Sequence, residues 1–272
     1  MISTETLKAR ALQIRKLSVQ MVSRVNASHI GSSFSMVELL TVLYSHFLKI
    51  DPARPQDPAR DRFILSKGHA AASLYATLAV HGFIDGSELE EYNLPGSRLL
   101  GHASHKVPGV ELSTGSLGHG LPVGCGLALA AKRLGRRHRT VVLVSDGELD
   151  EGSNWEAILF APHHKLDNLL LVVDYNKIQS LGNVKDVLDL HPLAEKFETF
   201  GWHVKEIDGH DVEQIRSALD NFAEVQGRPM VILAHTVKGK GVSYMENLLA
   251  WHYKSPNQEQ LAQALQELEE QQ

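Results

Sequence analysis

Oxygen-bearing side chains follow two consecutive apolar runs in the second half of the chain. The run TVVLV at 140–144 leads within two residues to Asp146, and the run LLLVV at 169–173 leads within three residues to Asn176. Parallel strands joined by one right-handed crossover end at the same edge of a sheet, so we expect these two side chains to meet. Carboxylate, amide and carbonyl oxygens suit a hard cation such as Mg²⁺ or Ca²⁺. Phosphate oxygens and water would complete the coordination of this cation. The spacing therefore favours a metal site that bridges to a bound diphosphate.

Each of these two residues also has a simpler interpretation. An aspartate that follows a strand commonly caps the next helix, and an asparagine commonly stabilises a turn. For Asp146 and Asn176 taken singly, these structural roles are the commoner ones. Spacing alone does not separate a metal site from a cap and a turn.

Histidine and glycine are frequent neighbours in this chain, which has 15 histidines and 21 glycines. Glycine permits tight turns, and histidine is the side chain that exchanges protons near neutral pH. Loops that carry acid–base groups are therefore expected at SHIG (28–31), KGH (67–69), GH (101–102), GHG (118–120) and GH (209–210).

The spacing of apolar residues predicts the elements that must hold these loops. An amphipathic helix is expected from Thr4 to about Val25, and a second helix at 36–48 is apolar almost all round and therefore buried. Three prolines in DPARPQDPARD end that helix in a surface loop. Further along, we expect a strand at 62–66, a helix at 70–80, an irregular glycine-rich loop at 111–120 and a small-residue helix at 121–134.

The second half alternates short apolar runs with helical segments, which is typical of a parallel sheet covered on both faces. The expected strands are 140–144, 169–173, 204–207 and 230–234, and the expected helices are 153–165, 190–200 and 211–225. We therefore predict an α/β fold of three layers, with a doubly wound, mainly parallel sheet between helices. A final helix at 257–270 carries Leu261, Leu265 and Leu268 on one face, and we expect it to pack loosely at the edge or on a partner.

Composition narrows the class of protein. The 272 residues are 43% hydrophobic and 22% charged, and no repeat or linker divides them, so a single domain over residues 1–272 is expected. A net charge of −5 without a long basic block speaks against nucleic-acid binding. No apolar stretch reaches membrane-spanning length, so no membrane association is expected. The single cysteine, Cys125, has no intrachain disulfide partner, which favours a cytoplasmic location.

Five segments in chain order resemble the transketolase family. The clearest is SDGELDEGSNWEA at 145–157, followed by DYNKIQ at 174–179, which together are similar to the thiamine diphosphate signature of that family. The other four similar segments are SHIGSSFSMVELLTVLY, RFILSKGHAAASLYATL, GVELSTGSLGHGLPVGCGLALA and FGWHVKEIDGHD. The resemblance extends from about residue 6 to residue 256.

The resemblance implies what the chain does and what it lacks. The chain is similar to the diphosphate-binding, amino-terminal part of a transketolase, without the pyrimidine-binding and carboxyl-terminal domains, and so resembles the amino-terminal subunit of a split transketolase. The implied activity is transfer of a two-carbon ketol unit between ketose and aldose phosphates. Thiamine diphosphate and Mg²⁺ or Ca²⁺ are the implied cofactors, and the complementary subunit is the implied partner in an α2β2 assembly. Two alternatives stay open: a related enzyme for a branched or sulfonated sugar, and a non-catalytic cofactor-binding subunit.

The resemblance also implies roles for individual residues. Asp146, Asn176 and the backbone carbonyl of Ile178 match metal ligands of the family. The residues that match cofactor contacts are His69, Gly115, Ser116, Leu117, Asp146, Gly147, Glu148, Asn176 and Ile178. The residues that match groups handling the sugar or its protons are His29, His69, His102 and His252, with Glu151 and Glu156 as a carboxylate pair at the subunit interface.

Other residues are expected to be structural or depart from the family pattern. A structural role is expected for His46, His81, His138, His163, His164 and His191. Departures from the usual family residues occur at Ala103, His119, Ser145 and Tyr175. Ala103 and His119 lie where we expect substrate preference to change, whereas no departure removes a predicted metal ligand.

Overall fold

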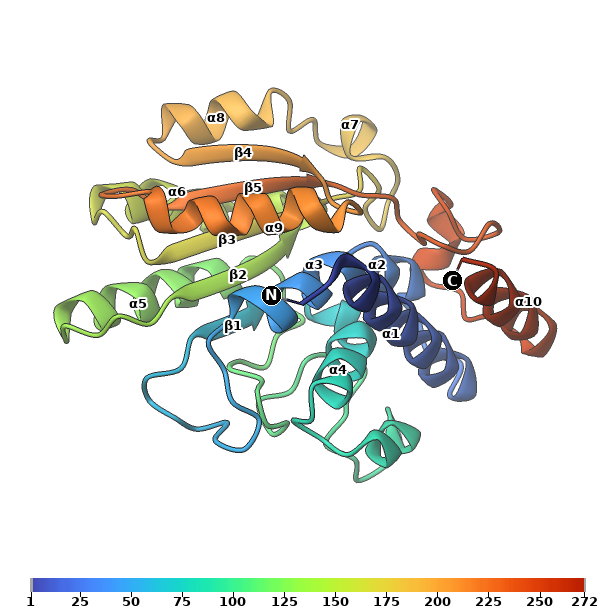
Figure 1. Cartoon of the computed structure of the whole chain (residues 1–272). Helices are drawn as coiled ribbons and strands as arrows, with labels where there is room; N and C mark the ends of the chain where they lie inside the picture. The colour runs from blue at the N-terminus through green and yellow to red at the C-terminus, as the bar shows by residue number, and fades with distance from the viewer. Residues whose placement is uncertain (1, 272) are drawn as a thin grey trace.

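A computed structural model describes residues 2–271 and shows parallel strands in one sheet (Figure 1). The strands are β1 (Arg62–Leu65), β2 (Thr140–Ser145), β3 (Leu169–Tyr175), β4 (His203–Asp208) and β5 (Met230–His235). Their order across the sheet is β1-β2-β3-β5-β4, and each neighbouring pair is parallel. Every residue of β2 and β3 is buried, as expected for strands that are covered on both faces.

Helices form a layer on each face of the sheet. Alternate residues of β2 show the two layers: Val141 and Leu143 belong to the core under α1–α4 and α9, whereas Val142 and Val144 belong to the core under α5, α6 and α8. The helices are α1 (Thr4–Arg24), α2 (Ile30–Phe34), α3 (Val37–Val42), α4 (Ala71–Val80), α5 (Gly120–Arg133), α6 (Gly152–His163), α7 (Val184–Val187), α8 (Leu193–Thr199), α9 (Val212–Asn221) and α10 (Gln258–Glu269). The predicted fold class, a doubly wound parallel sheet between two helical layers, is confirmed.

Two helices differ in extent from their predicted spans. The buried helix predicted at 36–48 consists of α3 and a π-helical segment, η1 (Leu43–Phe47). The helix predicted at 190–200 begins only at Leu193, because Pro192 disfavours helical geometry at the residue before it. The other predicted elements lie within two residues of their observed bounds, if the short turn η5 (Phe222–Glu224) is counted with α9.

The helix α10 packs on its own chain, which corrects the expectation that it would lie loosely at an edge or on a partner. Ala264 and Leu268 have no exposed surface and belong to the same core as the buried face of α1. Leu261 and Leu265 are partly buried against that core. Figure 1 shows α10 beside α1. The leucine face that the sequence predicted therefore finds its partner within the domain.

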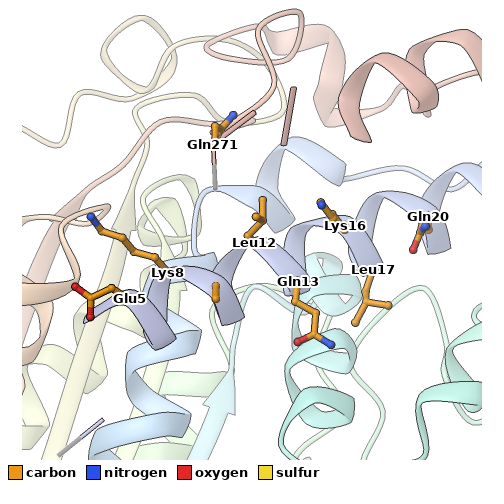
Figure 2. A pocket seen from close by; sticks show the side chains of 9 residues that line it. Glu5, Lys8, Leu12, Gln13, Lys16, Leu17, Gln20 and Gln271 are labelled. Carbon is orange, nitrogen blue, oxygen red and sulfur yellow. The ribbon is translucent and has the colours of Figure 1, made fainter. Parts of the chain in front are cut away.

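The outer face of α1 carries a groove of about 680 Å³ (Figure 2). Charged and amide side chains such as Lys8, Lys16 and Gln20 line it together with Leu12 and Leu17. None of the predicted site residues belongs to this part of the described chain. In residues 2–271, α1 included, no helix combines the length and the apolar character needed to cross a membrane.

Candidate active site

Most of the predicted site residues gather in a smaller cavity, of about 310 Å³, at the carboxyl ends of β2 and β3. Parallel α/β sheets bind their ligands at this edge. Ser145 pairs with Asp174 in the sheet register, so the loops that follow both strands open on the same space. The cavity is lined by His29, Ser32, His69, His102, Gly115, Leu117, Ser145, Asp146, Gly147, Asp150, Glu151, Asn176, Ile178, Gln179, Ser180, Lys238 and His252.

The three residues predicted to bind a metal line this cavity together. Oδ1 of Asp146 accepts a hydrogen bond from the N–H of Gly147 at 2.7 Å, and its Oδ2 accepts one from a backbone N–H of the loop after β3. Oδ1 of Asn176 accepts from the N–H of Ile178 at 3.2 Å. Asp146 also caps the 3₁₀ turn η4 (Gly147–Asp150). Asp146 therefore both caps this turn and lines the cavity.

The charge of Asp146 is buried at this point, since the residue is only 1% exposed. Burial and then the negative charge of Asp174 raise the pKa of Asp146 to about 6. A divalent cation would compensate this charge. A carboxylate, an amide oxygen and a carbonyl oxygen fit Mg²⁺ or Ca²⁺ better than a softer metal. Within residues 2–271 no cluster of three or more His, Cys, Asp or Glu side chains is arranged to hold a metal, so this mixed oxygen set is the candidate.

A buried ion pair lies behind the metal ligands. The side chains of Lys67 and Asp174 have no exposed surface, and Nζ of Lys67 donates to Oδ2 of Asp174. The same carboxylate accepts from Oγ of Ser35 at 2.6 Å, from Oγ1 of Thr236, and from the amide of Asn176 at 3.2 Å. Burial alone would raise the pKa of Asp174, but Lys67 and the hydrogen bonds from Ser35 and Thr236 lower it. Sequence reasoning missed the pair, although an acidic residue that ends an apolar strand indicates a buried partner.

Four histidines from separate segments bring their imidazoles together at the cavity. The ring centroid of His29 lies 5.0 Å from that of His69 and 5.9 Å from that of His102. It also lies 5.1 Å from the ring centroid of His252, whose carbonyl accepts from the N–H of His29 at 2.9 Å. The sequence predicted loops at His29, His69 and His102, and the tertiary fold brings these three residues together with His252.

Burial lowers the pKa of three of these imidazoles. The pKa of His29 falls to about 4, through burial and then the neighbouring His102. The pKa of His252 falls to about 3, through burial and then the charge of Lys238. Burial and then Lys67 hold the pKa of His69 well below its ordinary value. These rings are therefore neutral at pH 7, with one donor and one acceptor nitrogen each.

The glycine-rich loop contributes Gly115 and Leu117 to the cavity, but two predicted cofactor contacts lie elsewhere. Ser116 does not belong to the cavity lining within the described chain. Glu148 has no exposed surface and accepts a hydrogen bond from the N–H of Gly118 at 3.0 Å, which ties it to the back of the loop. Burial raises the pKa of Glu148. Glu148 therefore anchors the loop from behind and does not face the cavity.

Gly147 brings the two strand-end loops close together. A Cβ atom at this position would lie 2.6 Å from the Cβ of Gln179, much closer than van der Waals contact allows. The turn after β2 can therefore approach the loop after β3 only because residue 147 has no side chain.

The two carboxylates expected to act as a pair are separated in this chain. Glu151 lines the cavity, whereas Glu156 lines a hollow between α5 and α6 that also contains His119 and Cys125. Both glutamates are exposed. A proton shared between them would require a second chain that covers both residues.

Lys238 is a cavity residue that sequence reasoning missed. It is 1% exposed, donates to the carbonyl of Ile178 at 2.9 Å, and lies with Nζ 2.9 Å from Nδ1 of His252. Burial and then the charge of Lys67 lower the pKa of Lys238 to about 8. Among the described residues that line the cavity, it is the only lysine or arginine. In the sequence, Lys238 is followed by Gly239, Lys240 and Gly241, and these closely spaced glycines were the available signal for a tight turn. The other cavity residues that were not predicted are Ser32, Ser145, Asp150, Gln179 and Ser180.

The six histidines expected to be structural lie outside the cavity lining of the described chain. Nε2 of His81 lies 3.0 Å from Oγ of Ser45, and its Nδ1 lies 2.8 Å from the carbonyl oxygen of Thr77. Nε2 of His46 lies 2.7 Å from a carboxylate oxygen of Asp220. These contacts join helices to each other, which is what a structural histidine is expected to do.

A doubly wound α/β sheet whose strand ends carry an oxygen-rich cradle and a cluster of neutral imidazoles is typical of a cofactor-binding enzyme domain. The family can be stated more closely, because residues 6–269 match the family model described as transketolase, thiamine diphosphate binding domain. The chain belongs to this family of transketolase domains.

Known proteins that resemble the chain fall into two length classes. It is 46% identical over 266 residues to a subunit of the apulose-4-phosphate transketolase of Actinobacillus succinogenes, in a match that covers 97% of this chain and 95% of that protein. It is 40% identical over 264 residues to the 6-deoxy-6-sulfo-D-fructose transketolase subunit SqwG of a Clostridium species, covering 97% and 96%. It is 36% identical over 267 residues to the transketolase of Homo sapiens, covering 97% of this chain but 42% of that protein.

Solved structures show the same relationship. The transketolase of Campylobacter jejuni superposes with a TM-score of 0.93 at 33% identity, over 98% of this chain and 43% of that chain. The transketolase of Leishmania mexicana superposes with a TM-score of 0.93 at 30% identity, over 99% of this chain and 42% of that chain. The chain thus spans about two fifths of these transketolases and nearly the whole of the relatives named as transketolase subunits. The predicted family and the predicted fold are confirmed, and the roles of single residues stay predictions.

Proposed function

We propose that this chain is the diphosphate-binding subunit of a two-chain transketolase, which transfers a two-carbon ketol unit from a ketose phosphate to an aldose phosphate. One observation carries the proposal: the oxygen atoms of Asp146 and Asn176 and the imidazoles of His29 and His252 line a single cavity at the sheet edge. The near-complete coverage of relatives named as transketolase subunits supports it.

Thiamine diphosphate with a divalent cation fits the chemistry of this cavity. Asp146, Asn176 and the carbonyl of Ile178 would hold Mg²⁺ or Ca²⁺, and the ion would meet the diphosphate oxygens. Lys238 would place a positive charge against the same anion. When bound, the cofactor supplies the electron sink that cleavage of a carbon–carbon bond beside a carbonyl requires.

The imidazoles would orient the sugar and move its protons. His29 and His102 would contact sugar hydroxyl groups, and His69 would lie beside the diphosphate. Because the lowered pKa of His29 leaves it neutral at pH 7, its ring can accept a proton from a hydroxyl group and return it. His252, whose ring centroid lies 5.1 Å from that of His29, would assist it.

A second chain would complete the site. In this proposal, the single domain of residues 1–272 supplies the diphosphate half, and a complementary subunit supplies the pyrimidine-binding and carboxyl-terminal domains in an α2β2 assembly. The face formed by α5 and α6 supports a contact surface, because Val123, Leu159 and Phe160 are 40%, 61% and 38% exposed there. Covering this face would also bury Glu156 beside it. A cytoplasmic location agrees with the single, buried free thiol of Cys125.

An unusual sugar is the second candidate substrate. Two of the similar proteins carry the names of apulose 4-phosphate and 6-deoxy-6-sulfo-D-fructose, at 46% and 40% identity to this chain. These names favour a branched or sulfonated sugar as an alternative to the ordinary ketose phosphates. A non-catalytic role receives no support from them, because both proteins are named as transketolase subunits.

The proposal is tested by reconstitution. The chain is purified, mixed with its candidate partner subunit, thiamine diphosphate and Mg²⁺, and assayed for ketol transfer from ordinary, branched and sulfonated ketose donors. We expect transfer from the mixture and none from either chain alone. Robust transfer by this chain alone would refute the two-chain proposal, and a mixture that binds cofactor yet transfers from no donor would refute the activity.

A further inference from the structure

The segment that carries Lys238 is anchored to the fold on both sides of this residue. We call residues 236–241, which follow β5, the Lys238 loop. On one side, the N–H of Val237 donates to Nε2 of His210 at 2.8 Å. On the other side, Nε of Arg15 donates to the carbonyl of Lys240 at 3.0 Å. The lysine therefore lies between two anchors that come from different parts of the chain.

The two anchors belong to one buried network around Glu38. Nη1 and Nη2 of Arg15 donate to its two carboxylate oxygens at 2.5 and 2.7 Å, and Nδ1 of His210 lies 3.0 Å from Oε2. Arg15 is 5% exposed and Glu38 is 8% exposed. Because Nε2 of His210 accepts from Val237, Nδ1 carries the proton and donates to Glu38. The network thus holds His210 in one tautomer and directs its acceptor nitrogen to the Lys238 loop.

Lys238 reaches the cavity from this anchored loop. Its Nζ donates to the carbonyl of Ile178 at 2.9 Å and lies 2.9 Å from Nδ1 of His252. Hydrogen bonds of this length tolerate little displacement, so a backbone shift of about 1 Å would take both contacts out of range. The place of the ammonium group therefore depends on where the loop is held.

We propose that His210 and Arg15 are positioning residues, which hold the Lys238 loop so that its ammonium group stays in the cavity. The proposal rests on the proposed function, in which this ammonium group meets a diphosphate. His210 is outside the cavity lining of the described chain, so it acts through the backbone of Val237. The sequence predicted that Gly209 and His210 form a loop with an acid–base group, and we propose that His210 acts without contacting the ligand.

Two substitutions separate the two hydrogen bonds of His210. Glutamine places an acceptor near the position of Nε2 and keeps the bond from Val237, whereas asparagine places a donor near the position of Nδ1 and keeps only the bond to Glu38. Each variant loses one hydrogen bond, so both should lower the thermal stability by a similar amount. His81→Asn is the matched control, because both ring nitrogens of His81 are also hydrogen-bonded and it lies outside the cavity.

Two quantities are measured on the full chain. One is the hydrogen-exchange rate of peptides that cover the Lys238 loop, and the other is the affinity for thiamine diphosphate with Mg²⁺ after assembly with the partner subunit. We expect His210→Gln to behave like the wild type in both. We expect His210→Asn to exchange faster in this loop and to bind the cofactor roughly tenfold more weakly. His81→Asn should change the thermal stability alone.

Equal effects of His210→Gln and His210→Asn on affinity, or no effect of either, would overturn the proposal. If His210→Asn does not fold, Arg15→Lys takes its place, because lysine keeps the charge beside Glu38 but lacks the Nε donor to Lys240. Faster loop exchange with weaker cofactor binding is expected in that variant, and unchanged values would again overturn the proposal. A wild-type assembly that binds no thiamine diphosphate would instead refute the proposed function, while the exchange rates would still test the anchoring.

Discussion

The side-chain amide of Asn176 donates a hydrogen bond to Oδ2 of Asp174 at 3.2 Å. This contact commits the nitrogen of the amide to the buried ion pair with Lys67, and it leaves Oδ1 facing the N–H of Ile178 at 3.2 Å. Amide groups bind hard cations through oxygen. The buried ion pair of Lys67 and Asp174 therefore orients the amide oxygen of Asn176 that we propose as a metal ligand, as outer-shell partners commonly do.

Removal of the Asp146 carboxylate is expected to abolish metal-dependent cofactor binding. Asp146→Ala should weaken the affinity for thiamine diphosphate with Mg²⁺ by more than the roughly 10- to 100-fold cost of an outer-shell change. The fold should persist, because the variant removes a buried charge whose pKa is already raised by burial. Calorimetric titration measures the affinity, with the exposed Glu90→Ala as control. An affinity equal to that of the wild type would contradict the metal assignment.

Loss of an imidazole from the cavity is expected to slow turnover. Each of His29→Ala, His69→Ala and His102→Ala should lower kcat of the assembled enzyme by roughly 10²- to 10⁴-fold, which is the usual contribution of a positioned acid–base group. His81→Ala is the control, because His81 contacts only neighbouring helices and should affect stability without changing kcat. Steady-state kinetics with saturating cofactor provide the measurement. Losses smaller than about tenfold in all three variants would count against the proposed proton-handling role.

Two glycines of α5 are expected to respond to alanine in opposite directions. A Cβ at Gly124 would lie 2.4 Å from Cγ2 of Val142 on the central strand β2, so Gly124→Ala should lower the free energy of unfolding by about 1–3 kcal/mol. A Cβ at Gly126 would meet no atom within 4 Å, so Gly126→Ala should raise it by up to about 1 kcal/mol through helix propensity. Urea denaturation of the isolated chain compares the two. The same sign for both variants would show that α5 does not approach β2 as described.

The buried imidazoles of His29 and His252 are expected to make the isolated chain less stable as the pH falls below about 6.5. His29 and His252 have pKa values of about 4 and about 3 in the folded chain against an ordinary value of 6.5, so unfolding lets them bind protons that the folded state excludes. The unfolded state is therefore favoured as the pH falls from 6.5 toward 4, and each such proton adds a slope of at most about 1.4 kcal/mol per pH unit.

Denaturant unfolding of the chain without cofactor at several pH values measures this slope. His29→Gln and His252→Gln should each flatten it, whereas the same change at the exposed His105 should not. A slope that is the same in all of these variants would mean that the cavity imidazoles titrate normally in the folded chain.

Several features followed from the sequence because they depend on neighbours along the chain. Buried parallel strands appear as continuous apolar runs, and a right-handed crossover brings successive strand ends to one edge. These local rules are sufficient to place Asp146 and Asn176 at the same edge of the sheet. The same rules predicted the amphipathic face of α10 through Leu261, Leu265 and Leu268, but they did not identify what that face packs against.

The remaining features depend on packing between segments that are distant in sequence. The histidines at 29, 69, 102 and 252 meet only because four separate segments converge on one sheet edge. The Lys67–Asp174 pair joins the end of β3 to the turn after β1, and no local pattern announces a partner 107 residues away. By its place in the sequence, Glu148 matches a cofactor contact, yet in the fold its carboxylate accepts a hydrogen bond from Gly118 at the back of the glycine-rich loop. Local periodicity thus determined the helices and strands and the sheet edge where the site forms. The direction of each polar side chain was decided by long-range packing and by the need to pair every buried charge.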